Sequence, residues 1–360
     1  MRVFAALTLL LGAASSWGVA GAAAPGVEEA ADAVAAQALR DSPGGLVIGV
    51  SWGHRPAFVK GYGDADIVRK IPVTADTVFP ICSISKNFAA AAILKLSEQG
   101  RVELDAPVSR YFAKDPLPGR PVTVRQLLNH TSGEGSYNDG PSWKAVEARS
   151  IPREEMLARI GAEDHGEPGR SWGYSNSAFY VAGALVETVS GKDYWSDLDA
   201  AFFGPLSMTR SGPCSGVTER AHGYRLADGR AVDAETENWA NPFAGGGICA
   251  TARDLLAWES ALDAGRALRS ASVRSMREPT QPKDGPPFDY GLGTRLGVFE
   301  GHAVLGHSGG GQGFSTVLLR YPSDDLTIVV EPGFKNVQMK GPARFVFDGE
   351  LEPRRVSPRP

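Results

Sequence analysis

The chain has 360 residues, of which 42% are hydrophobic and 22% charged, as in an ordinary globular protein. This balance excludes a fibrous, coiled-coil or largely disordered chain. Its 37 basic and 41 acidic side chains give a net charge of −4, without a basic run in the body of the sequence. We therefore expect neither nucleic acid nor an anionic membrane as its partner.

The N-terminus has the pattern of a secretory signal peptide. A basic start is followed by an apolar run over 3–11 and by mostly small residues up to position 24. The apolar run is shorter than the roughly 20 residues that a membrane span needs. We expect residues 1–22 to be removed and the mature protein to be soluble, in the periplasm or outside the cell, without a stable membrane anchor. A buried helix of a cytosolic protein is the alternative.

The cysteines and histidines give little indication of a metal site. Cys82, Cys214 and Cys249 are too few for a disulfide scaffold. A pair between Cys214 and Cys249 is one option that the sequence leaves open. The six histidines form none of the usual zinc motifs. The sequence therefore predicts no metal and no cofactor.

Hydrophobic periodicity predicts strands towards both ends of the chain and helices between them. A first helix starts at Val27, and strand-like runs then follow at 46–52 and 57–62. Helices are expected at 83–99, at 123–129 behind a Thr123/Gln126 capping box, at 177–190 and at 251–264. Strand-like runs return at 290–298, 303–307, 314–321 and 326–330.

These elements predict an α+β fold. Strands within 44–80 and 288–332 would form one antiparallel sheet flanked by helices, with a mainly helical subdomain inserted over 83–285. We expect one domain over 23–345, a disordered tail at 346–360 and a monomeric protein.

The motif Ser83-Ile84-Ser85-Lys86 opens one of the predicted helices. It places a hydroxyl and an amine one helical turn apart on the same face. A serine becomes a nucleophile when a neighbouring base takes its proton, and a desolvated lysine can do this. The motif alone is weak, because about one SxxK is expected by chance in a chain of this length. An ordinary solvated helix start is the alternative.

Tyr174-Ser175-Asn176 precedes another predicted helix. Its phenol could act as a general base, and its amide could hold Lys86 or a substrate carbonyl. A buried tyrosine and a helix-capping asparagine are the alternative roles. Similarly, a structural role is favoured for His130, at the end of a capped helix.

His307-Ser308-Gly309 ends a predicted strand and continues into a glycine-rich run. Glycines allow a substrate backbone to lie close to a strand edge, and the Gly310 N–H could join that of Ser83 as an oxyanion hole. Residues 306–310 also fit the G-x-S-x-G nucleophile elbow. However, no histidine follows His307 to serve as the downstream base that this elbow requires.

Taken together and in this order, these motifs resemble the serine β-lactamase and penicillin-recognising hydrolase family. The likeness is to the branch with class C β-lactamases, D-alanyl-D-alanine carboxypeptidases and related esterases, and it runs over about 27–330. It implies that Ser83 forms an acyl-enzyme while Lys86 and Tyr174 handle its proton. It further implies that Asn176, His307, Ser308, Gly309 and Gly310 bind the substrate or its oxyanion.

Two positions and one segment depart from the family pattern. His307 stands where β-lactamases of this group generally have lysine, and a histidine that titrates at about pH 6.5 is a weaker, switchable partner for a carboxylate. Cys82 stands where glycine is common, and 336–350 lacks the usual amphipathic C-terminal helix.

We therefore expect a secreted serine hydrolase that cleaves an amide or ester. A D-alanyl-D-alanine carboxypeptidase or penicillin-binding-like enzyme acting on a peptidoglycan stem peptide is favoured. The alternatives are a carboxylesterase, a β-lactamase with weak turnover, and a non-catalytic penicillin-binding-like protein.

Overall fold

The computed structural model describes residues 26–40, 44–53, 57–139, 141–163, 165–299 and 301–334. The predicted signal peptide, residues 54–56 between the first two predicted strands, the segment 336–350 and the tail at 346–360 lie outside the described residues.

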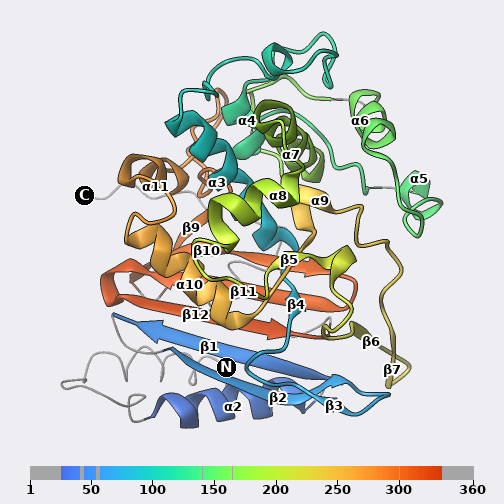
Figure 1. The fold of residues 1–360 in the computed structure, drawn as a ribbon, viewed down its shortest axis with the longest axis vertical. Helices are drawn as coiled ribbons and strands as arrows, with labels where there is room; N and C mark the ends of the chain where they lie inside the picture. The colour runs from blue at the N-terminus through green and yellow to red at the C-terminus, as the bar shows by residue number, and fades with distance from the viewer. Residues whose placement is uncertain are drawn as a thin grey trace.

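Strands from both ends of the chain form one antiparallel sheet, as predicted. Its seven strands are arranged in the order β3-β2-β1-β12-β11-β10-β9. The N-terminal strand β1 pairs with the C-terminal strand β12 from Leu46↔Pro332 to Trp52↔Leu326, and Figure 1 shows these blue and red strands side by side. The bounds are β1 Gly45–Trp52, β2 Phe58–Asp66, β3 Ile71–Pro72, β9 Arg295–Phe299, β10 His302–Gly311, β11 Phe314–Tyr321 and β12 Leu326–Pro332.

The central strands are apolar on both faces, because each face is covered. On β1, Leu46 and Ile48 pack into a core beneath helix α2 (Val27–Leu39), whereas Val47 joins the larger core on the opposite face. This alternation follows from the two-residue period of a strand. Gly49 gives helix α10 (Ala252–Asp263) room, because a Cβ there would lie 3.2 Å from Leu256. The sheet therefore separates α2 from the rest of the helices (Figure 1).

The helices above the larger core include the four that the sequence predicts between the strands. Thr123 and Gln126 form the expected capping box, and Gly191 ends its helix with a φ of 74°. The remaining bounds are α3 Ser85–Glu98, α4 Val124–Leu128, α5 Pro141–Lys144, α6 Arg153–Gly161, α7 Asn176–Ser190, α8 Tyr194–Leu198, α9 Phe243–Gly246 and α11 Ser270–Met276, with short helical turns at Cys82–Ile84, Val108–Tyr111, Asp199–Phe203, Cys214–Gly216 and Pro322–Asp324. Within the described ranges, none of the helices is long and apolar enough for a membrane span.

The structure also contains short strands outside the main sheet that the sequence pattern does not single out. Strands β4 (Phe79–Pro80), β8 (Ile248–Ala250) and β5 (Gly212–Pro213) form a second sheet. Strands β6 (Tyr224–Ala227) and β7 (Arg230–Asp233) form a hairpin. Elements of two to four residues are too short to give a recognisable period.

A disulfide joins Cys214 to Cys249 and so fixes the second sheet. The two cysteines are 35 residues apart in the sequence, and both are buried against Val78. The option that the sequence leaves open is therefore realised in the structure.

Removing this cross-link should destabilise the fold. For a loop of this length, loss of the constraint on the unfolded chain should lower the free energy of unfolding of the Cys214→Ala/Cys249→Ala variant by about 2–4 kcal/mol. Urea unfolding of oxidised wild type, reduced wild type and the variant measures the change. Reductant should have no further effect on the variant, and equal stability of the oxidised and reduced wild type would contradict the prediction.

Candidate active site

Ser83 lies in a tight turn, Cys82–Ile84, that leads directly into α3. Cys82 has a φ of 46°, in the left-handed region where a side chain is strained. This conformation accounts for the preference for glycine at the corresponding family position. Burial raises the pKa of the Cys82 thiol to about 12. The thiol is therefore kept protonated beside the nucleophile and is poorly disposed to oxidation.

Strand β10 passes very close to this turn. A Cβ on Gly309 would lie 2.1 Å from the carbonyl oxygen of Ile81, so only glycine permits this approach. Gly309 therefore contacts the backbone next to the nucleophile. By contrast, a Cβ on Gly310 would meet open space.

Lys86 is completely buried and makes three hydrogen bonds through its Nζ atom. Ser83 Oγ lies 3.1 Å from Nζ, while Asn176 Oδ1 and the Gly245 carbonyl oxygen each lie 2.7 Å from it. These partners come from the nucleophile turn, α7 and α9. Sequence-distant segments thus converge on one nitrogen atom.

The partners of Lys86 differ in what they can do. The Gly245 carbonyl and Asn176 Oδ1 can only accept hydrogen bonds, whereas the Ser83 hydroxyl can either accept or donate one. A neutral Lys86 amine can donate to the first two and still direct its lone pair at the Ser83 O–H. The arrangement therefore suits a base that takes the Ser83 proton.

Burial also favours the neutral amine. It lowers the pKa of Lys86, and the nearby Arg295 guanidinium adds to this effect while Tyr174 opposes it. The Lys86 Nζ atom lies 4.9 Å from the centre of the Tyr174 ring. Tyr174 therefore lies beside Lys86, the amine with which we expect it to share a proton.

A network around His130 holds the loop that carries Tyr174 and Asn176. The buried His130 Nδ1 accepts the Ser175 N–H at 3.1 Å, and its ring lies 4.4 Å from that of Tyr174, centre to centre. Ser175 Oγ in turn caps α7 by accepting the Ala178 N–H. His130 therefore positions the loop, in agreement with the structural role expected for it.

The amide of Asn176 is oriented by a further partner. Its Nδ2 donates to Asn138 Oδ1 at 2.9 Å, which turns Oδ1 towards Lys86. The alternative role of helix cap falls to Ser175 instead.

His307 is buried and makes both of its hydrogen bonds within the protein. Its Nδ1 lies 2.5 Å from the Ser308 carbonyl, which only accepts, so this nitrogen carries the proton. Nε2 then accepts from the Tyr290 hydroxyl at 3.1 Å. Burial lowers the pKa of His307 well below its usual range, and Arg295 and Lys86 reinforce this. We expected His307 to be a switchable partner for a carboxylate. In the structure it is instead a neutral ring that orients Tyr290.

Arg295 is a site residue that the sequence motifs did not reveal. It is 8% exposed, and its guanidinium carbon lies 5.7 Å from the centre of the Tyr174 ring and 5.8 Å from that of Tyr290. Its Nε makes no hydrogen bond within the described residues. Arg295 lies at the start of β9, opposite Gly306 of β10. This position is set by strand pairing and is not marked by a sequence motif.

The nucleophile opens onto a cleft. Its lining includes Ser83, Asn176 and Gly310, whereas His307, Ser308 and Gly309 are not among its described lining residues. Strand β9 pairs with β10 only as far as Gly306, so among the described residues the rest of that β10 edge has no partner strand. This open edge can accept an extended substrate backbone. Among all the residues that the structure describes, no three His, Cys, Asp or Glu side chains form a group suited to a metal ion.

Comparison with known proteins places this geometry in a family. The beta-lactamase family matches residues 22–331. The solved structure of D-amino acid amidase from Ochrobactrum anthropi SV3 with D-phenylalanine has a TM-score of 0.74 and 25% identity, covering 83% of this chain and 89% of that one. For the penicillin-binding protein from Bacillus halodurans the TM-score is 0.73 at 27% identity, with 83% and 94% covered. The chain belongs to the beta-lactamase family.

Curated relatives extend beyond the matched region. A D-aminopeptidase of Brucella anthropi is 30% identical over 281 residues, which cover 76% of this chain and 52% of the relative. A penicillin-binding protein of Bacillus subtilis (strain 168) is 29% identical over 289 residues, covering 74% and 63%. The chain thus spans about half to just under two thirds of their length.

The neutral His307 is directly testable by NMR. Because burial keeps the pKa of His307 low, its imidazole signals should not titrate around pH 6.5, about where exposed histidines do. A His307→Gln variant assigns the signal by removing it. Titration of that signal together with those of exposed histidines would contradict the assignment of a buried, neutral ring.

Proposed function

We propose that this protein hydrolyses amide bonds formed by D-amino acid residues, through an acyl-enzyme on Ser83. The observation that carries the proposal is the buried Lys86 amine, 3.1 Å from Ser83 Oγ, with its other two hydrogen bonds taken up by acceptors. The substrate class is supported by two of the similar proteins, a D-aminopeptidase and a D-amino acid amidase.

The reaction would proceed in two halves. Ser83 Oγ bonds to the carbonyl carbon and its proton passes to neutral Lys86, while the N–H groups of Ser83 and Gly310 stabilise the oxyanion. The carbon–nitrogen bond then breaks, and the leaving amine takes up a proton through Lys86 and Tyr174. In the second half, water attacks the Ser83 ester, releases the acid and restores the hydroxyl proton.

A D-alanyl-D-alanine carboxypeptidase remains a candidate within this class. The D-alanine released from such a substrate carries a free carboxylate. Arg295 supplies a fixed positive charge next to Tyr174. His307, to which the sequence assigned this role, is neutral and bonded to Tyr290. We therefore assign the carboxylate contact to Arg295.

We also propose that the enzyme acts in the periplasm or outside the cell. The signal-peptide pattern of residues 1–22 supports this location. The Cys214–Cys249 disulfide does so too, since such bonds persist in oxidising compartments.

Covalent labelling tests the nucleophile. A fluorophosphonate or a fluorescent penicillin should leave one adduct, which peptide mass spectrometry should locate on Ser83. Ser83→Ala should abolish the adduct, whereas Ser308→Ala, in the G-x-S-x-G segment, should still carry it on Ser83. An adduct on Ser308, or none on Ser83 with either reagent, would refute the assignment.

A substrate panel then tests the class of bond. We expect hydrolysis of a D-amino acid amide or of a peptide ending in D-alanyl-D-alanine in preference to a cephalosporin or a short-chain ester. Release of D-alanine from the peptide would indicate the carboxypeptidase. Turnover of the ester alone would favour the carboxylesterase.

A further inference from the structure

One wall of the cleft beside Ser83 carries an acidic side chain with no role in the proposed chemistry. Glu237 lines the cleft together with Asn138, Trp239 and Gln312. Among the described lining residues it is the only one with a charged side chain. The cleft is thus lined both by the nucleophile Ser83 and by the acidic side chain of Glu237.

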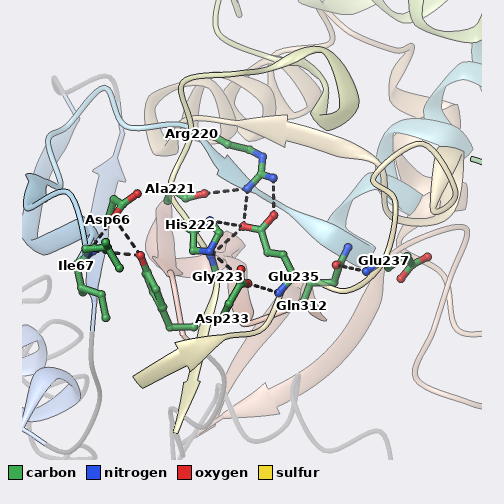
Figure 2. Close-up of polar contacts among 12 residues, drawn as sticks. Asp66, Ile67, Arg220, Ala221, His222, Gly223, Asp233, Glu235, Glu237 and Gln312 are labelled. Carbon is green, nitrogen blue, oxygen red and sulfur yellow. Dashed lines mark hydrogen bonds and ion pairs between the residues drawn. The ribbon is translucent and has the colours of Figure 1, made fainter. Parts of the chain in front are cut away.

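The Glu237 carboxylate has no partner in the described part of the chain. Its backbone N–H donates to Gln312 Oε1 at 2.6 Å, but no described residue donates a hydrogen bond to the carboxylate or forms an ion pair with it. Figure 2 shows the carboxylate pointing away from the Arg220–Glu235 pair. Its backbone is fixed while its charged end is left available.

The acidic side chain two residues earlier in the sequence, Glu235, is neutralised instead. Glu235 accepts two hydrogen bonds from Arg220, at 2.9 and 2.5 Å, and others from Gly223 and Trp239 (Figure 2). Arg220 is therefore fully engaged by Glu235. Lys144, the cation that acts on Glu237, is itself paired with Glu147 at 2.8 Å.

Leaving Glu237 without a cation has a cost. Burial, with a contribution from Glu147, raises its pKa to about 7. A half-buried carboxylate of this kind is stabilised when a ligand brings the missing positive charge. The surroundings of Glu237 thus suit a cationic ligand better than an internal structural role.

The geometry also indicates which part of a substrate would meet Glu237. The leaving amine must be protonated through Lys86 and Tyr174, so it lies on the Tyr174 side of Ser83. Tyr174 is absent from the described lining of the cleft that holds Glu237. The acyl part, on the other side of the scissile bond, therefore occupies this cleft.

We propose that Glu237 binds an ammonium group on the acyl part of the substrate. This inference rests on the proposed function, which it makes more specific. The ammonium could be the free α-amino group of an N-terminal D-residue or a side-chain amine, and both present the same charge to the carboxylate.

Binding to a protein that cannot turn over substrate tests the inference independently of hydrolysis. On the Ser83→Ala background, calorimetry compares D-alaninamide, Nα-acetyl-D-lysinamide and the neutral N-acetyl-D-alaninamide. Glu237→Gln should weaken binding of a cationic ligand by about tenfold to a hundredfold, as for loss of one charged hydrogen bond. It should leave the neutral ligand unaffected, and Glu278→Gln, an exposed matched control, should change neither.

The pattern of losses identifies the source of the ammonium. An effect on D-alaninamide indicates the α-amino group, and an effect on the lysine derivative indicates a side-chain amine. Equal binding of all three ligands, or an equal effect of Glu237→Gln on each, would overturn the inference. The proposed function fails separately, if Ser83 in the otherwise unchanged enzyme is neither labelled nor able to cleave any member of the substrate panel.

Discussion

The burial of one amine, that of Lys86, is the constraint on which the rest of the site depends. A lysine taken out of water must either satisfy its protons or lose its charge. Here two acceptors, on α7 and α9, occupy two of its hydrogen-bonding positions and leave the third for Ser83. The same contacts that make the burial tolerable direct the amine at the nucleophile.

Several close backbone approaches are needed to maintain this arrangement. Gly183 lets α7 pack against α9, where a Cβ would lie 2.4 Å from that of Ala244. Gly293, with a φ of 68°, lets the chain before β9 pack closely against α3. A Cβ added there would lie 2.7 Å from the Lys86 carbonyl oxygen. With Gly309 beside Ile81, these positions show that some of the chain's 43 glycines serve to assemble the site rather than to form turns.

The sequence was most informative where local chemistry determines structure. The capping box at Thr123, the glycine stop at Gly191 and the short apolar run of β11 all depend on neighbouring residues. Strand β9 begins at Arg295 rather than at Tyr290 because the chain between them turns through Gly291 and Gly293.

The contributions of Arg295 and Glu237, and the low pKa of His307, arise from tertiary burial and could not be deduced from local pattern. Arg295 places a positive charge beside Tyr174, and Glu237 places a negative charge in the cleft. A substrate with an ammonium on its acyl side and a carboxylate on its leaving side would complement both charges.

The protonation of Lys86 provides the most direct test of this account. Lysine labelled with carbon-13 at Cε reports each amine by NMR, and Lys86→Met identifies the relevant signal. The account predicts that Lys86 loses its proton at a lower pH than the exposed lysines of the same protein. A Lys86 signal that titrates with the exposed lysines, or above them, would contradict the assignment of Lys86 as the base for Ser83.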